Sequence, residues 1–175
     1  MNKISHTREF VALKIAVLTV SDTRTDKTDV SGRSLVECLQ EGGHELVEKN
    51  IVIDDVYQVR AKVSQWIADA QINVVLVTGG TGFAVRDITP EAINPLLDRQ
   101  IEGFGELFRS LSYHEIASST IQSRAFAGLA NRTLIFCMPG STQACRMTWE
   151  NILLQQLDGR YSPCNFVQII FPAAE

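Results

Sequence analysis

The chain has few cysteines, and they lack the spacing of a metal or redox motif. There are four in 175 residues, with no C-x-x-C pair and no histidine at the distance typical of a zinc ligand set. This argues against a small metal-bound or dithiol domain. Cys137 falls in an apolar strand pattern and Cys145 in an apolar helical stripe, so both are predicted to be buried, and all four thiols are predicted to be free.

An excess of positive charge and long apolar runs are also absent. Sixteen Lys and Arg residues stand against 20 Asp and Glu residues, a formal net charge of -4, which argues against a general nucleic-acid binder. A local phosphate site is still compatible with this charge, since one arginine beside a glycine loop is enough. With no apolar run of membrane length and no signal-peptide pattern, we expect a cytoplasmic protein with no membrane partner.

What is present is a regular alternation of apolar strands and amphipathic helices. Strands are expected over 13–20, 45–53, 73–78, 123–128 and 132–138, with helices between most of them, the first capped by Ser31. Such alternation predicts an α/β protein with three α/β/α layers and a mostly parallel central sheet. We place this single domain at 13–166, with an N-terminal arm at 1–12 and a C-terminal tail at 167–175.

Residues 74–82 organise this pattern. Four apolar residues run into Thr78-Gly79-Gly80-Thr81-Gly82, which is typical of a buried parallel strand followed by a loop whose backbone N–H groups can approach an anion. Arg86 and Asp87 follow, and we interpret them as an ion pair. Thr89 is then expected to cap a helix opened by Pro90.

Polar residues also follow the other parallel strands of the predicted sheet. Ser21-Asp22 comes after the first strand, Asp54-Asp55 after the second and Pro139-Gly140-Ser141 after the last. Because parallel strands end at the same edge of a sheet, these loops are expected to converge on the glycine loop. The sequence therefore predicts a ligand site at this edge.

Each of these features also has a purely structural interpretation, and the residues alone leave both open. The glycine loop is either a phosphate or pterin site or a tight turn, and Gly140-Ser141 is either a phosphate-binding helix start or a turn with a cap. Ser21 is equally ambiguous. Asp54 can be a helix cap and Asp87 a solvated acid, but together at neighbouring strand ends they would form the pair of carboxylates typical of nucleotide-bound Mg²⁺.

Several motifs together resemble the MoaB/MogA family of molybdenum cofactor biosynthesis proteins. They are Thr78-Gly79-Gly80-Thr81-Gly82, Arg86-Asp87-Ile88-Thr89-Pro90-Glu91-Ala92, Gly103-Phe104-Gly105-Glu106 and Met138-Pro139-Gly140-Ser141. The resemblance runs from about Leu13 to about Phe166. A second group is similar to the MoaB branch in particular: Ser31-Gly32, Trp66-Ile67, Gln122-Ser123-Arg124-Ala125, Cys145-Arg146, Trp149-Glu150-Asn151 and Pro163-Cys164-Asn165-Phe166.

The resemblance implies a molybdopterin-binding fold and an adenylyl transfer from Mg-ATP to molybdopterin that releases pyrophosphate. By position, Asp54 and Asp87 match two acids linked to Mg²⁺ and to catalysis. The nucleotide-binding positions are Gly79, Gly80, Thr81, Gly82 and Arg86, and the molybdopterin-binding positions are Ser21, Pro139, Gly140 and Ser141. The resemblance also implies a homotrimer, with pairing of two trimers into a hexamer in MoaB-type proteins.

One position departs from the family pattern, and two other functions stand beside the enzyme. The family often has a lysine two residues after the serine of its Pro-Gly-Ser motif, where this chain has Gln143, and the nearest basic residue is Arg146. The alternatives are a carrier that binds molybdopterin without chemistry and a purely structural oligomer. The apolar segment 101–111 favours packing against a second copy of the chain.

Overall fold

The computed structural model describes residues 3–4 and 9–171 of the chain. Its elements in chain order are β1 (Lys3–Ile4), β2 (Lys14–Val20), α1 (Val30–Glu41), β3 (Glu45–Val52), α2 (Val56–Ala68), β4 (Val74–Thr78), α3 (Thr89–Ile93), η1 (Asn94–Leu96), β5 (Arg99–Gln100), α4 (Glu102–Ile116), η2 (Ala117–Gln122), β6 (Phe126–Ala130), β7 (Thr133–Met138), α5 (Thr142–Thr148), the π-helical η3 (Trp149–Leu153), α6 (Leu154–Gln156), β8 (Tyr161–Ser162) and α7 (Val167–Ile170). None of the described helices is long and apolar enough to cross a membrane.

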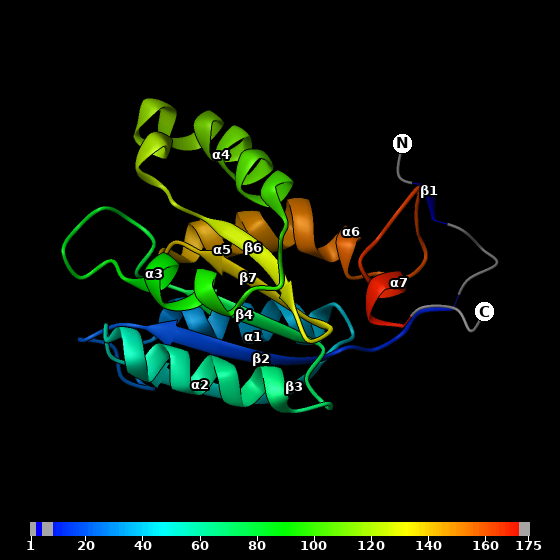
Figure 1. Cartoon of the computed structure of the whole chain (residues 1–175). Helices are drawn as coiled ribbons and strands as arrows, with labels where there is room; N and C mark the ends of the chain where they lie inside the picture. The colour runs from blue at the N-terminus through cyan, green and yellow to red at the C-terminus, as the bar shows by residue number, and fades with distance from the viewer. Residues whose placement is uncertain (1–2, 5–8, 172–175) are drawn as a thin grey trace.

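Six strands form one sheet in the order β3-β2-β4-β7-β6-β5. Strands β3, β2, β4 and β7 run parallel, and β6 runs antiparallel to both of its neighbours. This confirms the mostly parallel sheet. The strand expected over 123–128 begins later, at Phe126, and ends at Ala130. In Figure 1 the carboxyl ends of the parallel strands face left, and the green loop between β4 and α3 extends beyond them.

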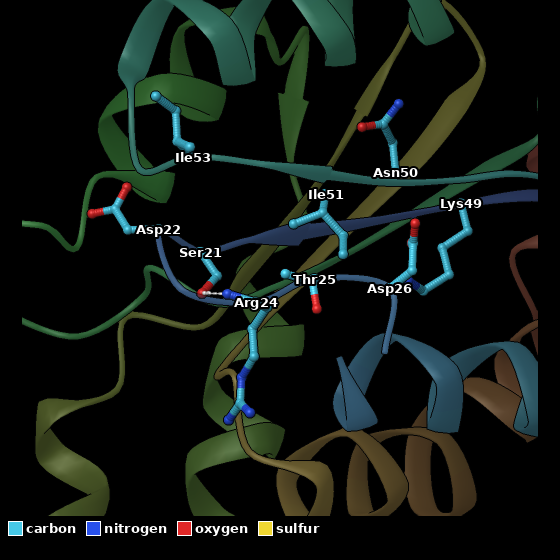
Figure 2. Close-up of a pocket in the computed structure, with 9 residues that line it drawn as sticks. All are labelled: Ser21, Asp22, Arg24, Thr25, Asp26, Lys49, Asn50, Ile51 and Ile53. Atoms are coloured by element: carbon cyan, nitrogen blue, oxygen red, sulfur yellow. Dashed lines mark hydrogen bonds and ion pairs between the residues drawn. The ribbon is translucent and has the colours of Figure 1, made fainter. Parts of the chain in front are cut away.

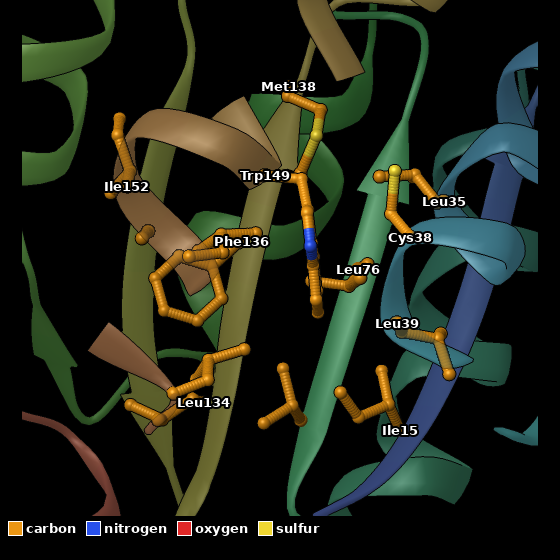
Figure 3. Packing of buried hydrophobic residues seen from close by; sticks show 14 of the residues in the cluster. Ile15, Leu35, Cys38, Leu39, Leu76, Leu134, Phe136, Met138, Trp149 and Ile152 are labelled. Atoms are coloured by element: carbon orange, nitrogen blue, oxygen red, sulfur yellow. The ribbon is translucent and has the colours of Figure 1, made fainter. Parts of the chain in front are cut away.

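The central strands contribute side chains to two hydrophobic cores, one on each face of the sheet. On β2, Ile15 and Val17 belong to one core, and Ala16 and Leu18 belong to the other, because consecutive side chains of a strand point to opposite faces. The first core lies under α1, α4 and α5, and Figure 3 shows it packed around Trp149. The second lies under α2 and α3. Burial on both faces explains why the strands are unbroken apolar runs.

Two predicted helix caps are wrong. Asp29, not Ser31, caps α1, with its carboxylate accepting a backbone N–H of the first turn at 2.9 Å. Ser31 lies inside that turn, and its hydroxyl donates to the carbonyl of Gly140 at 2.7 Å. Thr89 is likewise inside α3, and its hydroxyl donates to the carbonyl of Gly79 at 2.8 Å. Both hydroxyls tie the start of a helix to a loop at the strand ends.

The ends of the chain lie partly outside the described residues. Of the predicted arm, Lys3–Ile4 forms β1 and pairs antiparallel with Tyr161–Ser162, while 1–2 and 5–8 fall outside the description. Of the predicted tail, Val167–Ile170 forms α7, and its Val167 and Ile170 are buried in the first core. Residues 172–175 again fall outside the description. The packed body thus extends past residue 166.

The cysteines behave as the pattern predicts. Cys38, Cys137 and Cys145 are buried, Cys164 is exposed, and all four are free. Burial raises the pKa of the Cys137 thiol well above its ordinary value and that of Cys145 to about 12. The three buried thiols therefore stay protonated and serve as apolar core side chains.

A buried carboxylate joins α1 to the sheet. Asp29 is 1% exposed, accepts the hydroxyl of Thr19 at 2.9 Å and pairs with Lys49 Nζ at 2.6 Å. Burial alone would raise the pKa of Asp29, but the hydrogen bonds from Lys49, Gly32 and Thr19 outweigh it and hold the pKa below its usual range. The pair fixes the start of α1 against β2 and β3, near their carboxyl ends.

We expect Asp29→Asn to lower the free energy of unfolding by about 2–3 kcal/mol near pH 7, because the amide can keep the cap but loses its charge opposite Lys49. The folded pKa of Asp29 is depressed, so its contribution is present above the ordinary value of 3.8 and is lost as pH falls through the lower folded value. Urea unfolding from about pH 7 to about pH 3 measures both effects. Equal stability near pH 7, or a gap that does not narrow in acid, would contradict this.

Candidate functional site

The glycine loop begins where three strands end. Gly79, the first residue after β4, has a φ of +104° and donates its N–H to the carbonyl of Met138, at the end of β7, at 3.0 Å. A Cβ on Gly79 would overlap the carbonyl oxygen of Val20, at the end of β2. Gly140 lies on another side, where an added Cβ would come 3.3 Å from the Cα of Gly79. Only glycine fits at position 79.

The next three residues of the loop present unused polar groups. The backbone N–H groups of Gly80, Thr81 and Gly82 donate to no acceptor within 3–4 and 9–171. The hydroxyl of Thr81 is buried and has no hydrogen-bond partner in the same part of the chain. Gly80 has a φ of +64°, and a Cβ there would lie 2.5 Å from the hydroxyl of Thr89. Because buried polar groups are nearly always paired, the Thr81 hydroxyl marks a position where a ligand atom or water would be bound.

Acidic residues from different strand ends meet beside this loop. Asp54 Oδ2 accepts the N–H of Asp22 at 2.9 Å, and Asp22 Oδ1 accepts the N–H of Asp54 at 3.1 Å. Asp54 Oδ1 lies 3.4 Å from the position of a Cβ on Gly80. Asp87 Oδ2 lies 2.6 Å from the corresponding position on Gly82. The structure thus brings the two predicted acids, Asp54 and Asp87, to one rim of the sheet.

The electrostatics differ between the acids. Burial raises the pKa of Asp54, and the negative charges of Asp22 and Asp87 raise it further, against the lowering effects of the Asp22 N–H and of Arg86. The pKa of Asp22 is lowered, first by the hydrogen bond from Arg86 and then by the backbone N–H of Asp54. A cation between Asp54 and Asp87 would offset the part of this rise that comes from the negative charge of Asp87, whereas the larger part comes from burial.

Arg86 does not pair with Asp87, which corrects the expected ion pair. Its Nε donates to Asp22 Oδ2 at 2.7 Å, and its Nη2 contacts the same oxygen. Asp87 Oδ2 instead accepts the backbone N–H of Ala84 at 2.8 Å. The position of Asp22 directly after a strand predicted its place at this edge but not its role, and the structure shows it as the partner of Arg86.

A second residue that was not singled out for the site is Arg124, which lies just before β6. Its Nε donates to the carbonyl of Gly82 at 2.7 Å, and its Nη2 donates to the carbonyl of Asp87 at 2.6 Å. Arg124 is 37 residues from Asp87 in sequence, so no local pattern indicates the contact. Only the motif Gln122-Ser123-Arg124-Ala125 marked the segment.

The residues predicted for the pterin side lie at the same edge, one in the turn after β2 and the others at the start of α5. The hydroxyl of Ser21 accepts two backbone N–H groups of its own turn at 3.3 Å each. Pro139-Gly140-Ser141 leads into α5, and Ser141 caps this helix by accepting the N–H of Ala144 at 3.2 Å. Between the loop of Ser21 and β3 lies an open cleft of about 420 Å³ (Figure 2), lined by Ser21, Asp22, Arg24, Thr25, Asp26, Lys49, Asn50, Ile51 and Ile53.

The carboxylates at this rim fit a hard cation that is shared with a phosphate. In the described part of the chain, no three His, Cys, Asp or Glu side chains gather closely enough to hold a metal ion alone. Asp54 and Asp87 offer two carboxylates, whereas Asp22 is already paired with Arg86. Mg²⁺ is usually held by one or two carboxylates, with phosphate oxygens and water as its other ligands. The residues therefore fit Mg²⁺ in company with a phosphate ligand.

This geometry is that of an α/β protein with a mostly parallel sheet and polar loops gathered at its carboxyl edge. The model of the probable molybdopterin binding domain family matches residues 16–159. Molybdenum cofactor biosynthesis protein B of Escherichia coli (strain K12) is 57% identical over 158 residues, which cover 90% of this chain and 93% of the relative. The chain therefore belongs to the MoaB/MogA family of molybdenum cofactor biosynthesis proteins.

Solved structures agree with this assignment. A crystal structure of a molybdenum cofactor biosynthesis protein B is similar with a TM-score of 0.84 and 40% identity, covering 94% of this chain and 97% of that one. The tungsten cofactor synthesizing protein MoaB from Pyrococcus furiosus is similar with a TM-score of 0.73 and 37% identity, covering 81% and 91%. The predicted family and fold class are both confirmed.

We expect Gly79→Ala to lower the free energy of unfolding by at least about 2 kcal/mol. The new Cβ must displace the end of β2, and the alanine must keep a positive φ that it rarely adopts. Gly103→Ala in α4 is the matched control, since a Cβ there meets nothing within 4 Å. It should leave stability unchanged or raise it by up to about 1 kcal/mol. Urea unfolding of both variants measures the difference, and equal midpoints would argue against the close approach.

Proposed function

We propose that this protein binds molybdopterin and transfers the adenylyl group of ATP to it with the help of Mg²⁺, releasing pyrophosphate. The observation that carries the proposal is the rim where the free N–H groups of the glycine loop lie beside Asp54 and Asp87. The family supports the ligand class, because its matched domain is described as a probable molybdopterin binding domain.

The proposed reaction asks the protein for position and charge. An oxygen of the terminal phosphate of molybdopterin attacks the α-phosphorus of ATP. The bond from that phosphorus to the bridging oxygen of the β-phosphate breaks, and pyrophosphate leaves with the electron pair. The attacking phosphate oxygen is already deprotonated, so no general base is required. Holding the two phosphates in line can supply about 7–11 kcal/mol of the barrier reduction.

Each group at the rim has a role in this proposal. The N–H groups of Gly80, Thr81 and Gly82 donate to phosphate oxygens where charge develops. Arg86 offsets the negative charge of Asp22 at the same rim, which reduces the repulsion between that acid and a phosphate. When bound, Mg²⁺ would neutralise phosphate charge, and Asp54 and Asp87 are the residues that would hold it.

The pterin side is assigned to the loops that flank the glycine loop. Ser21 lines the cleft of about 420 Å³, a volume within the usual range for small-molecule sites. Pro139-Gly140-Ser141 lies on another side of Gly79, where Gly140 makes the close approach. Arg146, the basic residue nearest to Gln143, pairs with Glu37 at 3.2 Å and so is engaged away from these loops.

A pyrophosphate assay distinguishes the proposed enzyme from the alternatives. Purified protein is mixed with molybdopterin and Mg-ATP, and pyrophosphate release is followed with time. An adenylyltransferase releases pyrophosphate only when all three are present. A carrier binds molybdopterin in calorimetry but releases none, and a purely structural oligomer binds neither molybdopterin nor ATP.

We expect Asp87→Asn to abolish pyrophosphate release while leaving the affinity for molybdopterin within a few-fold, because the amide keeps the shape but removes the charge needed beside Mg²⁺. Asp69→Asn is the matched control. Asp69 also accepts one nearby backbone N–H, at 2.8 Å, but it follows α2, before β4 begins. Unchanged pyrophosphate release by Asp87→Asn would refute the assigned role.

We also propose that the chain forms a homotrimer, with a hexamer of two trimers as the larger assembly. Phe104 and Phe108 pack in the core of this chain, so they no longer argue for an interface. Leu107 and Tyr113 of α4 and Ile121 of η2 are exposed and support one. Sedimentation equilibrium at micromolar concentration should give three or six times the chain mass of 19.4 kDa. A mass of one chain would contradict the proposal.

A further inference from the structure

The loop from Gly82 to Asp87 has little packing of its own. Phe83 is 69% exposed and Val85 is 95% exposed. The bonds that close the loop join Asp87 to Ala84: the N–H of Asp87 donates to the Ala84 carbonyl at 2.9 Å, and the Ala84 N–H donates to Asp87 Oδ2 at 2.8 Å. These local bonds shape the turn but do not fix its direction relative to the rest of the rim.

One side chain from a distant segment holds both ends of this loop. The Arg124 guanidinium donates to the carbonyl of Gly82 through Nε and to the carbonyl of Asp87 through Nη2, at 2.7 and 2.6 Å. The donors of a guanidinium are rigid and planar, so binding two carbonyls at once sets the distance and angle between them. The two ends of the loop are therefore placed by a single rigid group.

Arg124 is itself held on several sides. Its backbone N–H donates to the carbonyl of Thr81 at 2.8 Å, its Nη1 pairs with Glu91 of α3, and its Cζ lies 5.1 Å from the centre of the Phe83 ring. Its side chain is 24% exposed, so the pairs are partly shielded from water. This leaves the guanidinium little freedom to turn away from the loop.

The segment that carries Arg124 is fixed from its other side by α4. Arg109 Nη1 donates to the carbonyl of Ala125 at 3.1 Å. Gly105 permits this contact, since a Cβ there would lie 2.6 Å from the Ala125 oxygen and 3.0 Å from the Arg109 guanidinium. Gly105, from the motif Gly103-Phe104-Gly105-Glu106, thus serves the placement of this segment.

We propose that Arg124 is a positioning residue that sets the carboxylate of Asp87 against the glycine loop, and that Arg109 keeps Arg124 in place from α4. The role in turnover rests on the proposed adenylyl transfer. The ordering of the loop does not, because it follows from contacts within the chain, those of Arg124 together with the pair of Arg86 and Asp22. The two parts can therefore be tested separately.

The first test measures the order of the loop by hydrogen–deuterium exchange of peptides that cover 81–88, without any ligand. Arg124→Ala and Arg124→Lys should both raise amide exchange in this segment by about tenfold, since lysine cannot bridge two carbonyls and Glu91. Peptides from β2 and β4 should be unchanged. Wild-type exchange over 81–88 in both variants would overturn the proposal, whatever reaction the protein performs.

The second test separates positioning from simple loss of structure. In the pyrophosphate assay, kcat of both variants should fall by about 100-fold, with the KM for ATP changing less than threefold, because a small misplacement of a reacting group costs about that much. Added guanidinium ion should recover at least about fivefold of the activity of Arg124→Ala and none for Arg124→Lys. The role in turnover would be overturned by a wild-type kcat in the variants. It would also be overturned if the KM for ATP rose by as large a factor as kcat fell and guanidinium ion gave no rescue.

Arg60→Ala is the matched control for both tests. Arg60 also binds two backbone carbonyls, those of Glu91 and Ala92, at 2.8 and 3.1 Å, but it does not touch the loop. It should leave exchange over 81–88 and kcat within twofold of wild type. If wild-type protein releases no pyrophosphate, the proposed reaction fails, while the exchange measurement still decides the role of Arg124 in the loop. Loop exchange raised as much by Arg60→Ala as by Arg124→Ala would overturn the proposal.

Discussion

The site depends on the close approach of three strand ends at Gly79. Parallel pairing sets Thr19 beside Thr78 and Thr78 beside Met138, so β2, β4 and β7 end level with one another. The volume that a side chain would occupy is filled by the carbonyl of Val20. A larger residue would push β2 aside, and the acids that follow β2 and β3 would move with it. The tight backbone contact is thus what keeps acids and loop donors at one rim.

The charged groups at this rim shift the pKa values of two of its acids in opposite directions. Asp22 is matched by Arg86, which lowers its pKa. Asp54 is partly buried, lies near two other negative charges and has a raised pKa. The protein therefore supplies enough positive charge for one acid and leaves the others in need of a cation. The N–H groups of the loop, in contrast, need an anion. A metal ion with a phosphate would satisfy both demands together.

The sequence was sufficient for most of the fold because burial on both sheet faces leaves unbroken apolar runs such as Val74 to Val77. The sequence was insufficient to predict the hydrogen bonds and ion pairs that polar side chains form with other loops at the edge of the sheet. Ser31 and Thr89 are typical cap residues, yet their hydroxyls bind carbonyls of other loops. Arg86 pairs not with its neighbour Asp87 but with Asp22, which is 64 residues away in the sequence. Strand order decides such contacts, and spacing along the chain does not encode it.

The placement of the site along the chain has a consequence for how it forms. Its parts come from Ser21 at one end to Ser141 at the other, and the arginine that holds the loop precedes β6. A fragment that ends before β7 lacks Pro139-Gly140-Ser141 and the Met138 carbonyl that binds Gly79, so the complete rim forms only when β7 has joined the sheet. Any ligand that binds there must then stabilise the entire domain by mass action, and its affinity can be read from a shift in global melting.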